Sequence, residues 1–164
     1  MLALAVDIGL ARLGYGLVLP GIRADISGSF AAFGAVATAH FAGYLAGSLV
    51  TPVLLRRDRS ARTTVTVAHV AVGLSLFVCA FASDIIQLGV FRAVLGFGCG
   101  VGVAAVVTGA LERVRPSARA SVSGSAWAGI GVAVLLSAPA TPWLLDGSGH
   151  WRFGTALAGV FPST

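Results

Sequence analysis

The stretch that decides the fold is Phe91-Arg92-Ala93-Val94-Leu95-Gly96-Phe97-Gly98-Cys99-Gly100-Val101-Gly102. It lies within residues 85–111, an apolar run longer than the about 20 residues that a helix needs to cross a bilayer. Arg92 places a permanent cation among hydrocarbon side chains. Four glycines follow at every second position, and they are Gly96, Gly98, Gly100 and Gly102. Glycine costs a helix about 1 kcal/mol relative to alanine in water, but in a membrane it lets a second backbone approach closely. The stretch therefore predicts a transmembrane helix that packs tightly against a neighbour and carries a charge that has to be neutralised.

The composition of the whole chain agrees with a membrane protein. Of its 164 residues, 57% are hydrophobic and 10% are charged, and the mean hydropathy is +0.92. A soluble domain carries about 25% charged residues, so this chain cannot cover a soluble surface. The net charge of +5 does not indicate a nucleic-acid partner, because the arginines lie between apolar runs instead of along one face.

Charged and turn-forming residues divide the chain into apolar runs. Five runs are long enough to span a bilayer, at residues 2–22, 30–55, 64–83, 85–111 and 121–145, and a sixth at 151–164 has about half the length needed. We expect an all-α fold, a polytopic transmembrane helix bundle of five full spans plus an incomplete sixth, forming a single domain over residues 1–164. Asp7 and Arg12 interrupt the first run, which favours a span over a signal peptide. Pro20 and Gly21 are expected to close that span.

Small residues mark one face of the second run. Ala31, Ala35, Ala39, Gly43 and Gly47 recur every four residues, so they share one side of a helix and include a Gly-x-x-x-Gly pair. We interpret Gly43 and Gly47, like the four glycines of the fourth run, as helix-packing positions. The two cysteines are expected to be small buried residues, with a disulfide or a metal site as the alternative.

The arginines predict the orientation. Residues 56–62 and 113–119 hold seven arginines, whereas the opposite connections hold two, Arg23 and Arg152. Cytoplasmic loops carry the cationic excess, so the N-terminus is expected to be cytoplasmic. Trp143 and Trp151 then fall at the outer interface, where an aromatic belt is expected.

These features together resemble the N-terminal half of a major facilitator superfamily transporter. Asp58, Arg59 and Arg62 match the superfamily signature Gly-x-x-x-Asp-Arg-x-Gly-Arg-Arg, in which Leu54 and Ala61 stand for the two glycines and Thr63 for the last arginine. In the superfamily this loop gates the cytoplasmic face, and the resemblance implies that role for Asp58, Arg59 and Arg62.

Three further segments carry the resemblance. Arg92 and Gly96 resemble the Arg-x-x-x-Gly pattern of the fourth span. Residues 9–20 and the Gly129-Ile130-Gly131 triplet, followed by Ala138-Pro139 with Ala138 in place of a glycine, resemble the YbfB/YjiJ-type branch. The resemblance implies a substrate site near the bilayer midplane and alternating access between two six-helix halves.

Five residues are candidates for substrate binding or coupling. An arginine in hydrocarbon costs from about 3 to well over 10 kcal/mol, so Arg12 and Arg92 are expected either to line a cavity or to hold helices together as structural ion pairs. Asp7 is either a proton site or an interfacial acid. Tyr15 and His40, the latter about 15 Å into its span by helical rise, either hydrogen-bond a substrate or pack.

No enzyme is expected. The glycines at every second position do not form Gly-x-Gly-x-x-Gly, no HExxH metal motif is present, and a chain without lysine has no Walker lysine. No cofactor and no metal site are predicted. The sequence predicts a secondary active transporter of a small anionic or polar solute in the cytoplasmic membrane, as the N-terminal part of a longer transporter.

The expected partners of such a transporter follow from its class. They are the bilayer, a small-molecule substrate, protons, and either a C-terminal half or a second copy of the chain. We expect the chain alone to transport nothing. The alternative is a truncated or assembly membrane protein that does not transport, and a reading frame that continues with six more spans would distinguish the two.

Overall fold

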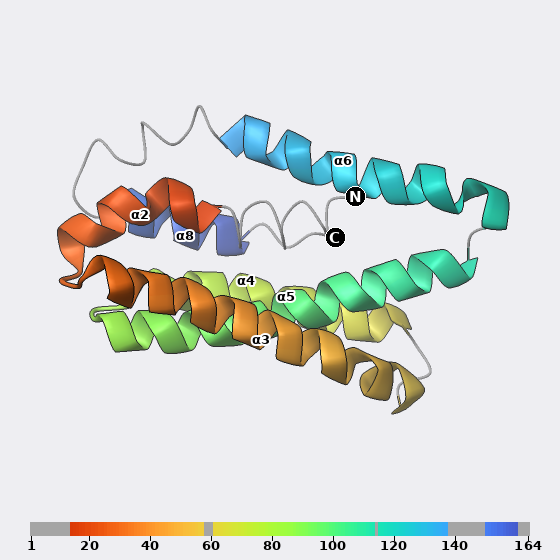
Figure 1. Cartoon of the computed structure of the whole chain (residues 1–164), viewed down its shortest axis with the longest axis horizontal. Helices are drawn as coiled ribbons and strands as arrows, with labels where there is room; N and C mark the ends of the chain where they lie inside the picture. Colours follow the sequence, from red (N-terminus) through yellow and green to blue (C-terminus); the bar gives the residue numbers. More distant parts are fainter. Residues whose placement is uncertain (1–13, 58–60, 114, 138–149, 161–164) are drawn as a thin grey trace.

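The computed structural model describes residues 14–57, 61–113, 115–137 and 150–160, and the regular elements in these ranges are all helices (Figure 1). The helices are α2 (Gly14–Asp25), α3 (Phe30–Arg57), α4 (Ala61–Cys79), α5 (Ile85–Arg113), the 3-10 turn η2 (Pro116–Ala118), α6 (Arg119–Ser137) and α8 (His150–Val160). The predicted all-α class is therefore confirmed for the part of the chain that is described.

Three of these helices are long and apolar enough to cross a membrane. They cover Phe30–Arg56 in α3, Arg62–Cys79 in α4 and Ile85–Gly109 in α5, at the positions expected for the second, third and fourth spans. The first, fifth and sixth spans stay predictions, because residues 1–13, 138–149 and 161–164 lie outside the described residues.

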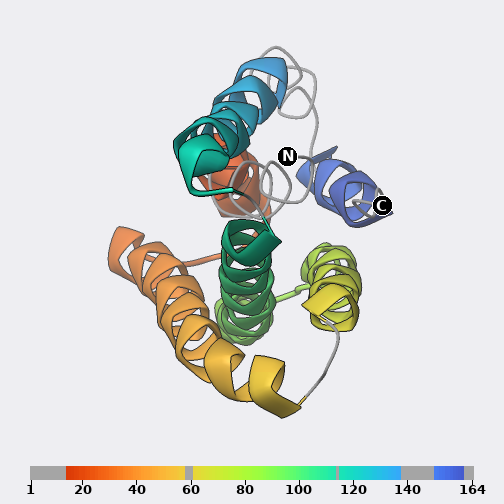
Figure 2. The ribbon, with the colours of Figure 1, turned by 90° about the vertical axis from the view of Figure 1, so that its right-hand side faces the viewer.

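Helix α5 is the centre of the fold. It lies between α3 and α4 and contacts both (Figure 2). Helix α8 packs against α4 and touches α2. Leu95 and Cys99 of α5 are fully buried together with Val72 and Leu76 of α4. Among the three described helices suited to cross a membrane, the one with the most glycines is also the most enclosed.

A second core cluster joins the first span to the rest. Ile22 of α2, Phe33 of α3, Leu88 of α5 and Trp151 of α8 are buried in one cluster. Phe91 packs against this cluster and against the one between α4 and α5. One aromatic side chain therefore connects the two halves of the core.

The expected end of the first span is wrong. Pro20–Gly21 lies inside α2, which continues to Asp25. A proline removes one backbone hydrogen bond, but packing can hold a membrane helix across the gap. Here Val18, Ile22 and Ile26 recur every four residues and are all buried in one cluster. The packing of this face stabilises the helix by more than the hydrogen bond lost at Pro20 costs.

The boundary between the third and fourth spans also differs from the expectation. Helix α4 ends at Cys79, four residues before the predicted end of its span at residue 83. Asp84 starts the next helix, α5. Its Oδ1 accepts hydrogen bonds from the N–H groups of Ile86 and Gln87, both at 2.8 Å. The Gln87 side chain in turn accepts from the Ser83 backbone at 3.1 Å. Asp84 is therefore an N-cap of α5.

Candidate functional site

A seam of glycines joins α3 to α5. A Cβ atom added to Gly43 or Gly47 would collide with the carbonyl oxygen of Ala93 or Phe97 on α5. In the other direction, Cβ atoms on Gly96 and Gly100 would collide with the carbonyl oxygens of His40 and Tyr44 on α3. The two backbones are in direct contact, and the four glycines alternate from one helix to the other.

The remaining predicted packing glycines lie elsewhere on α5. Gly98 faces α4, where an added Cβ would stand 3.1 Å from Val72 Cγ2. Gly102 is buried. The glycines at every second position therefore serve two neighbours, because alternate positions on a helix point about 160° apart after allowance for 3.6 residues per turn.

His40 lies at the end of the seam that is nearest to Arg92. Its side chain is 4% exposed, and its Nδ1 atom stands 3.2 Å from the backbone carbonyl oxygen of Arg92. Protonated at Nδ1, the imidazole donates to that carbonyl and ties α3 to α5 across the seam. His40 also stacks edge-on against Phe41, with ring centroids 5.9 Å apart.

The Arg92 side chain is buried in the same region, with 5% of its surface exposed. Its guanidinium carbon lies 4.2 Å from the centroid of the Tyr15 ring on α2. A cation on the face of an aromatic ring is attracted by the ring quadrupole, and more strongly where water is excluded. The ring is held in place because the Tyr15 hydroxyl donates to the carbonyl oxygen of Phe33 at 3.3 Å.

Three of the five predicted site residues thus come together from three helices. Tyr15 comes from α2, His40 from α3 and Arg92 from α5. The other two candidates, Asp7 and Arg12, lie outside the described residues, as do Asp58 and Arg59 of the predicted gating loop. Arg62, the third residue of that loop, is exposed in the first turn of α4.

This arrangement can hold a negative charge. A guanidinium is protonated at any physiological pH and presents five N–H donors, and burial strengthens its electrostatic interactions. Tyr15 covers one face of the group, and the donors lie along its edge. A carboxylate or phosphate oxygen is the chemistry that fits such a group.

A second polar cluster was not predicted from the sequence. The indole N–H of Trp151 donates to Asp25 Oδ2 at 2.8 Å, and the same oxygen lies 3.7 Å from Arg152 Nε. Arg152 also donates to the Ala80 carbonyl at 2.8 Å. The cluster joins the C-terminal ends of α2 and α4 to the start of α8. The signal that the sequence offered for this cluster is weak. An acid, Asp25, and two hydrogen-bond donors, Trp151 and Arg152, lie in or next to connections expected on the same side of the membrane.

This cluster corrects the interpretation of Trp151 as a residue of an interfacial aromatic belt. A belt tryptophan faces lipid headgroups, whereas Trp151 is 1% exposed and lies in the core cluster with Ile22 and Leu88. The indole is buried because Asp25 satisfies its N–H inside the protein. Trp143 lies outside the described residues.

Comparisons with known proteins identify the family. A search of curated proteins finds no match. The family model described as "Uncharacterised MFS-type transporter YbfB" matches residues 4–162, nearly the whole chain. The match includes the helices that carry Tyr15, His40 and Arg92, together with the charged connection at residues 56–62. The chain therefore belongs to the YbfB-type family of major facilitator superfamily transporters.

Proposed function

We propose that the protein is a secondary active transporter of a small anionic or polar solute and that Arg92 binds the solute or couples its movement. The family match supports membrane transport. The observation that carries the finer proposal is a nearly fully buried arginine in a helix suited to cross the bilayer. Insertion of that charge into the membrane costs free energy, and binding of an anionic solute would give the charge a function.

Tyr15 and His40 have supporting roles in this proposal. The Tyr15 ring lies against the guanidinium, and His40 holds the Arg92 backbone. Asp7 and Arg12 are proposed as further coupling residues, with protons as the coupling ion. A second set of spans, from a C-terminal half or another copy of the chain, would complete a midplane cavity that opens alternately to either side.

The proposed location is the cytoplasmic membrane, with a cytoplasmic N-terminus. Arg56, Arg62, Arg115 and Arg119 are exposed in or next to connections that the charge asymmetry assigns to the cytoplasm. By resemblance to the superfamily, Asp58, Arg59 and Arg62 gate that face.

The test compares Arg92→Leu with Arg92→Lys and with a control, Arg115→Leu. Each variant is made in a transporter that includes the C-terminal half and is reconstituted in proteoliposomes, and the uptake of labelled mono- and dicarboxylates is measured under an imposed proton gradient. We expect Arg92→Leu to lower saturable uptake at least tenfold at equal reconstitution, because leucine removes the charge and eases insertion. Lysine keeps a charge without the fork of donors and should retain part of the uptake. Arg115→Leu removes an exposed arginine and should leave uptake unchanged.

Three results would contradict the proposal or part of it. Full uptake by a well-reconstituted Arg92→Leu protein would remove Arg92 from the site. Loss of that variant from the membrane would assign Arg92 a structural role instead. A wild-type protein that takes up none of these solutes, with its C-terminal half present, would favour the non-transporting alternative.

A further inference from the structure

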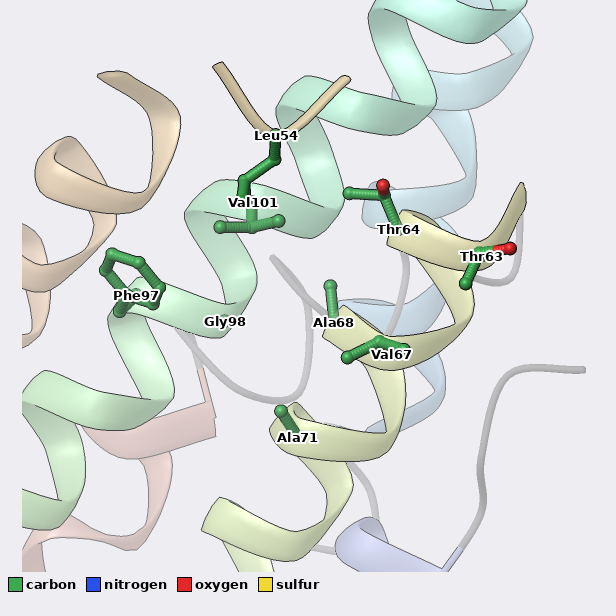
Figure 3. Close-up of a pocket in the computed structure, with 9 residues that line it drawn as sticks. All are labelled: Leu54, Thr63, Thr64, Val67, Ala68, Ala71, Phe97, Gly98 and Val101. Carbon is green, nitrogen blue, oxygen red and sulfur yellow. The ribbon is translucent and has the colours of Figure 1, made fainter. Parts of the chain in front are cut away.

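A groove lies between α4 and α5. It has a volume of about 330 Å³. Its wall on α4 runs from Thr63 to Ala71, its floor is Gly98 on α5, and Leu54 of α3 closes one end (Figure 3). This volume is at the lower end of the about 300–1,000 Å³ that ligand pockets occupy. Arg92, Tyr15 and His40 do not line it.

Small residues create the groove. Gly98 has no side chain, and Ala68 and Ala71 contribute only methyl groups where α4 passes over α5. The sides are open, since Val67 is 62% and Phe97 is 40% exposed. Because α4 and α5 are both suited to cross the bilayer, the groove between them lies at the depth of the hydrocarbon, where acyl chains can enter it.

The groove has the depth of one lipid leaflet. Eight residues separate Thr63 from Ala71, which corresponds to about 12 Å along a helix at 1.5 Å per residue. Half of a bilayer's hydrocarbon core is about 15 Å. The lining is apolar apart from the hydroxyls of Thr63 and Thr64 at one end. The shape and chemistry therefore match a single acyl chain.

The threonine end of the groove is also its basic end. Leu54 lies two residues before Arg56, and Arg62 precedes Thr63, and both arginines are exposed. The sequence between them adds two arginines and one aspartate. The first turn of α4 contains no acidic residue, so the positive end of its helix dipole is not offset there. An anion at this position would meet a positive potential from two sources.

From the apolar groove and this basic end we propose a lipid site: one acyl chain of an anionic glycerophospholipid occupies the groove, its phosphate headgroup contacts Arg62, and Arg56 adds positive charge at the same level of the membrane. The site is separate from the Arg92 region and does not depend on the transported solute. Basic side chains near a membrane surface attract anionic lipids over zwitterionic ones, so the site is selective for phosphatidylglycerol over phosphatidylcholine with the same acyl chains.

Native mass spectrometry of the protein in detergent micelles tests the proposal. The protein is titrated with dioleoyl phosphatidylglycerol and, separately, with dioleoyl phosphatidylcholine, and the first bound lipid is quantified. We expect the anionic lipid to bind at least tenfold more tightly. Arg56→Gln with Arg62→Gln should weaken its binding about 30-fold, given the attraction that each basic side chain contributes, and should leave phosphatidylcholine unaffected.

A third variant tests the groove independently of the charges. Ala71 is exposed and lines the groove, so Ala71→Trp fills it without entering the core, and it should weaken binding of both lipids. The matched control is Ala42→Trp, at an exposed position of α3 that does not line the groove. Arg115→Gln with Arg119→Gln removes the same number of exposed charges elsewhere. Both controls should bind lipid like the wild type.

Three outcomes would overturn the proposal. They are equal affinity for the two lipids, unchanged phosphatidylglycerol binding by the Arg56 and Arg62 double variant, and unchanged binding by Ala71→Trp. A dimer that Ala71→Trp abolishes would assign the groove to a second copy of the chain instead. Circular dichroism and size-exclusion chromatography show whether each variant is folded. If the Arg56 and Arg62 double variant does not fold, the Ala71→Trp variant still tests the groove.

Discussion

The position of Arg92 shows how a cation can be kept inside an apolar helix bundle. Its guanidinium lies on the face of Tyr15, and the carbonyl of the same residue lies beside the His40 imidazole. Aromatic faces attract cations without bringing a second full charge into the interior. A ring therefore lowers the cost of burying the arginine.

This contact can be measured with a double-mutant cycle. We expect Tyr15→Leu to lower the free energy of unfolding more in the wild type than in the Arg92→Leu background, by about 1–2 kcal/mol, the range of a partly desolvated cation–π contact. Unfolding in micelles of mixed detergent and sodium dodecyl sulfate gives the energies. Tyr15→Phe is the control, since it keeps the ring and loses only the hydroxyl bond to Phe33. Equal costs in the two backgrounds would show that the ring does not stabilise the cation.

At the scale of elements, the sequence predicts which helices form better than where they end. The second and fourth apolar runs gave α3 and α5 within two residues at either end. The first run did not end at its proline, because the buried face of Val18, Ile22 and Ile26 continues past it. Packing against residues far away in the chain decided that boundary, and the signal in the sequence that could have indicated it is the four-residue spacing of Val18, Ile22 and Ile26 across the proline.

The seam between α3 and α5 gives a prediction at the same scale. Gly96→Ala should lower the free energy of unfolding by about 1–3 kcal/mol, the cost typical of overpacking, because the new methyl group meets the His40 backbone. Gly89→Ala on the same helix is the matched control. Its methyl group would stand 3.8 Å from Val36 Cγ2, an ordinary contact, so it should be neutral or stabilising by up to about 1 kcal/mol.

The same unfolding assay in micelles measures both alanine variants. If the two substitutions change stability equally, backbone contact across the seam is not what holds α3 to α5.

For the whole molecule, the convergence of Tyr15, His40 and Arg92 was not predictable from spacing. Each was singled out as a polar residue within an apolar run, but they lie on three different helices, and helical periodicity says nothing about how helices pair. The direct contact of α3 with α5 brings two of them together, and Tyr15 of α2 adds the third through its contacts with Phe33 and Arg92. Asp25 was not predicted as a site residue, because an acidic residue in a connection is normally interpreted as exposed to water.

The orientation of the whole molecule can be tested by labelling. In a background of Cys79→Ala and Cys99→Ala, both buried positions, single cysteines replace Ser27 and Ser117, which are exposed in connections at opposite ends of the spans. A membrane-impermeant thiol reagent on intact cells should label Ser27→Cys and spare Ser117→Cys, since the arginine asymmetry places residue 117 in the cytoplasm. Labelling of both in permeabilised cells is the control. The reverse pattern on intact cells would overturn the proposed topology.

The glycine seam has a consequence for inheritance. Any single-base change in a glycine codon that alters the amino acid gives a larger residue, and at Gly43, Gly47, Gly96 and Gly100 every larger residue meets the backbone of the other helix. A compensating change on the facing helix is not available either, because the obstructing atoms are carbonyl groups that no codon alters. Each change at these four positions therefore carries a cost in stability, whereas the exposed positions of the same two helices, such as Leu49 and Val94, can drift among apolar residues one base at a time.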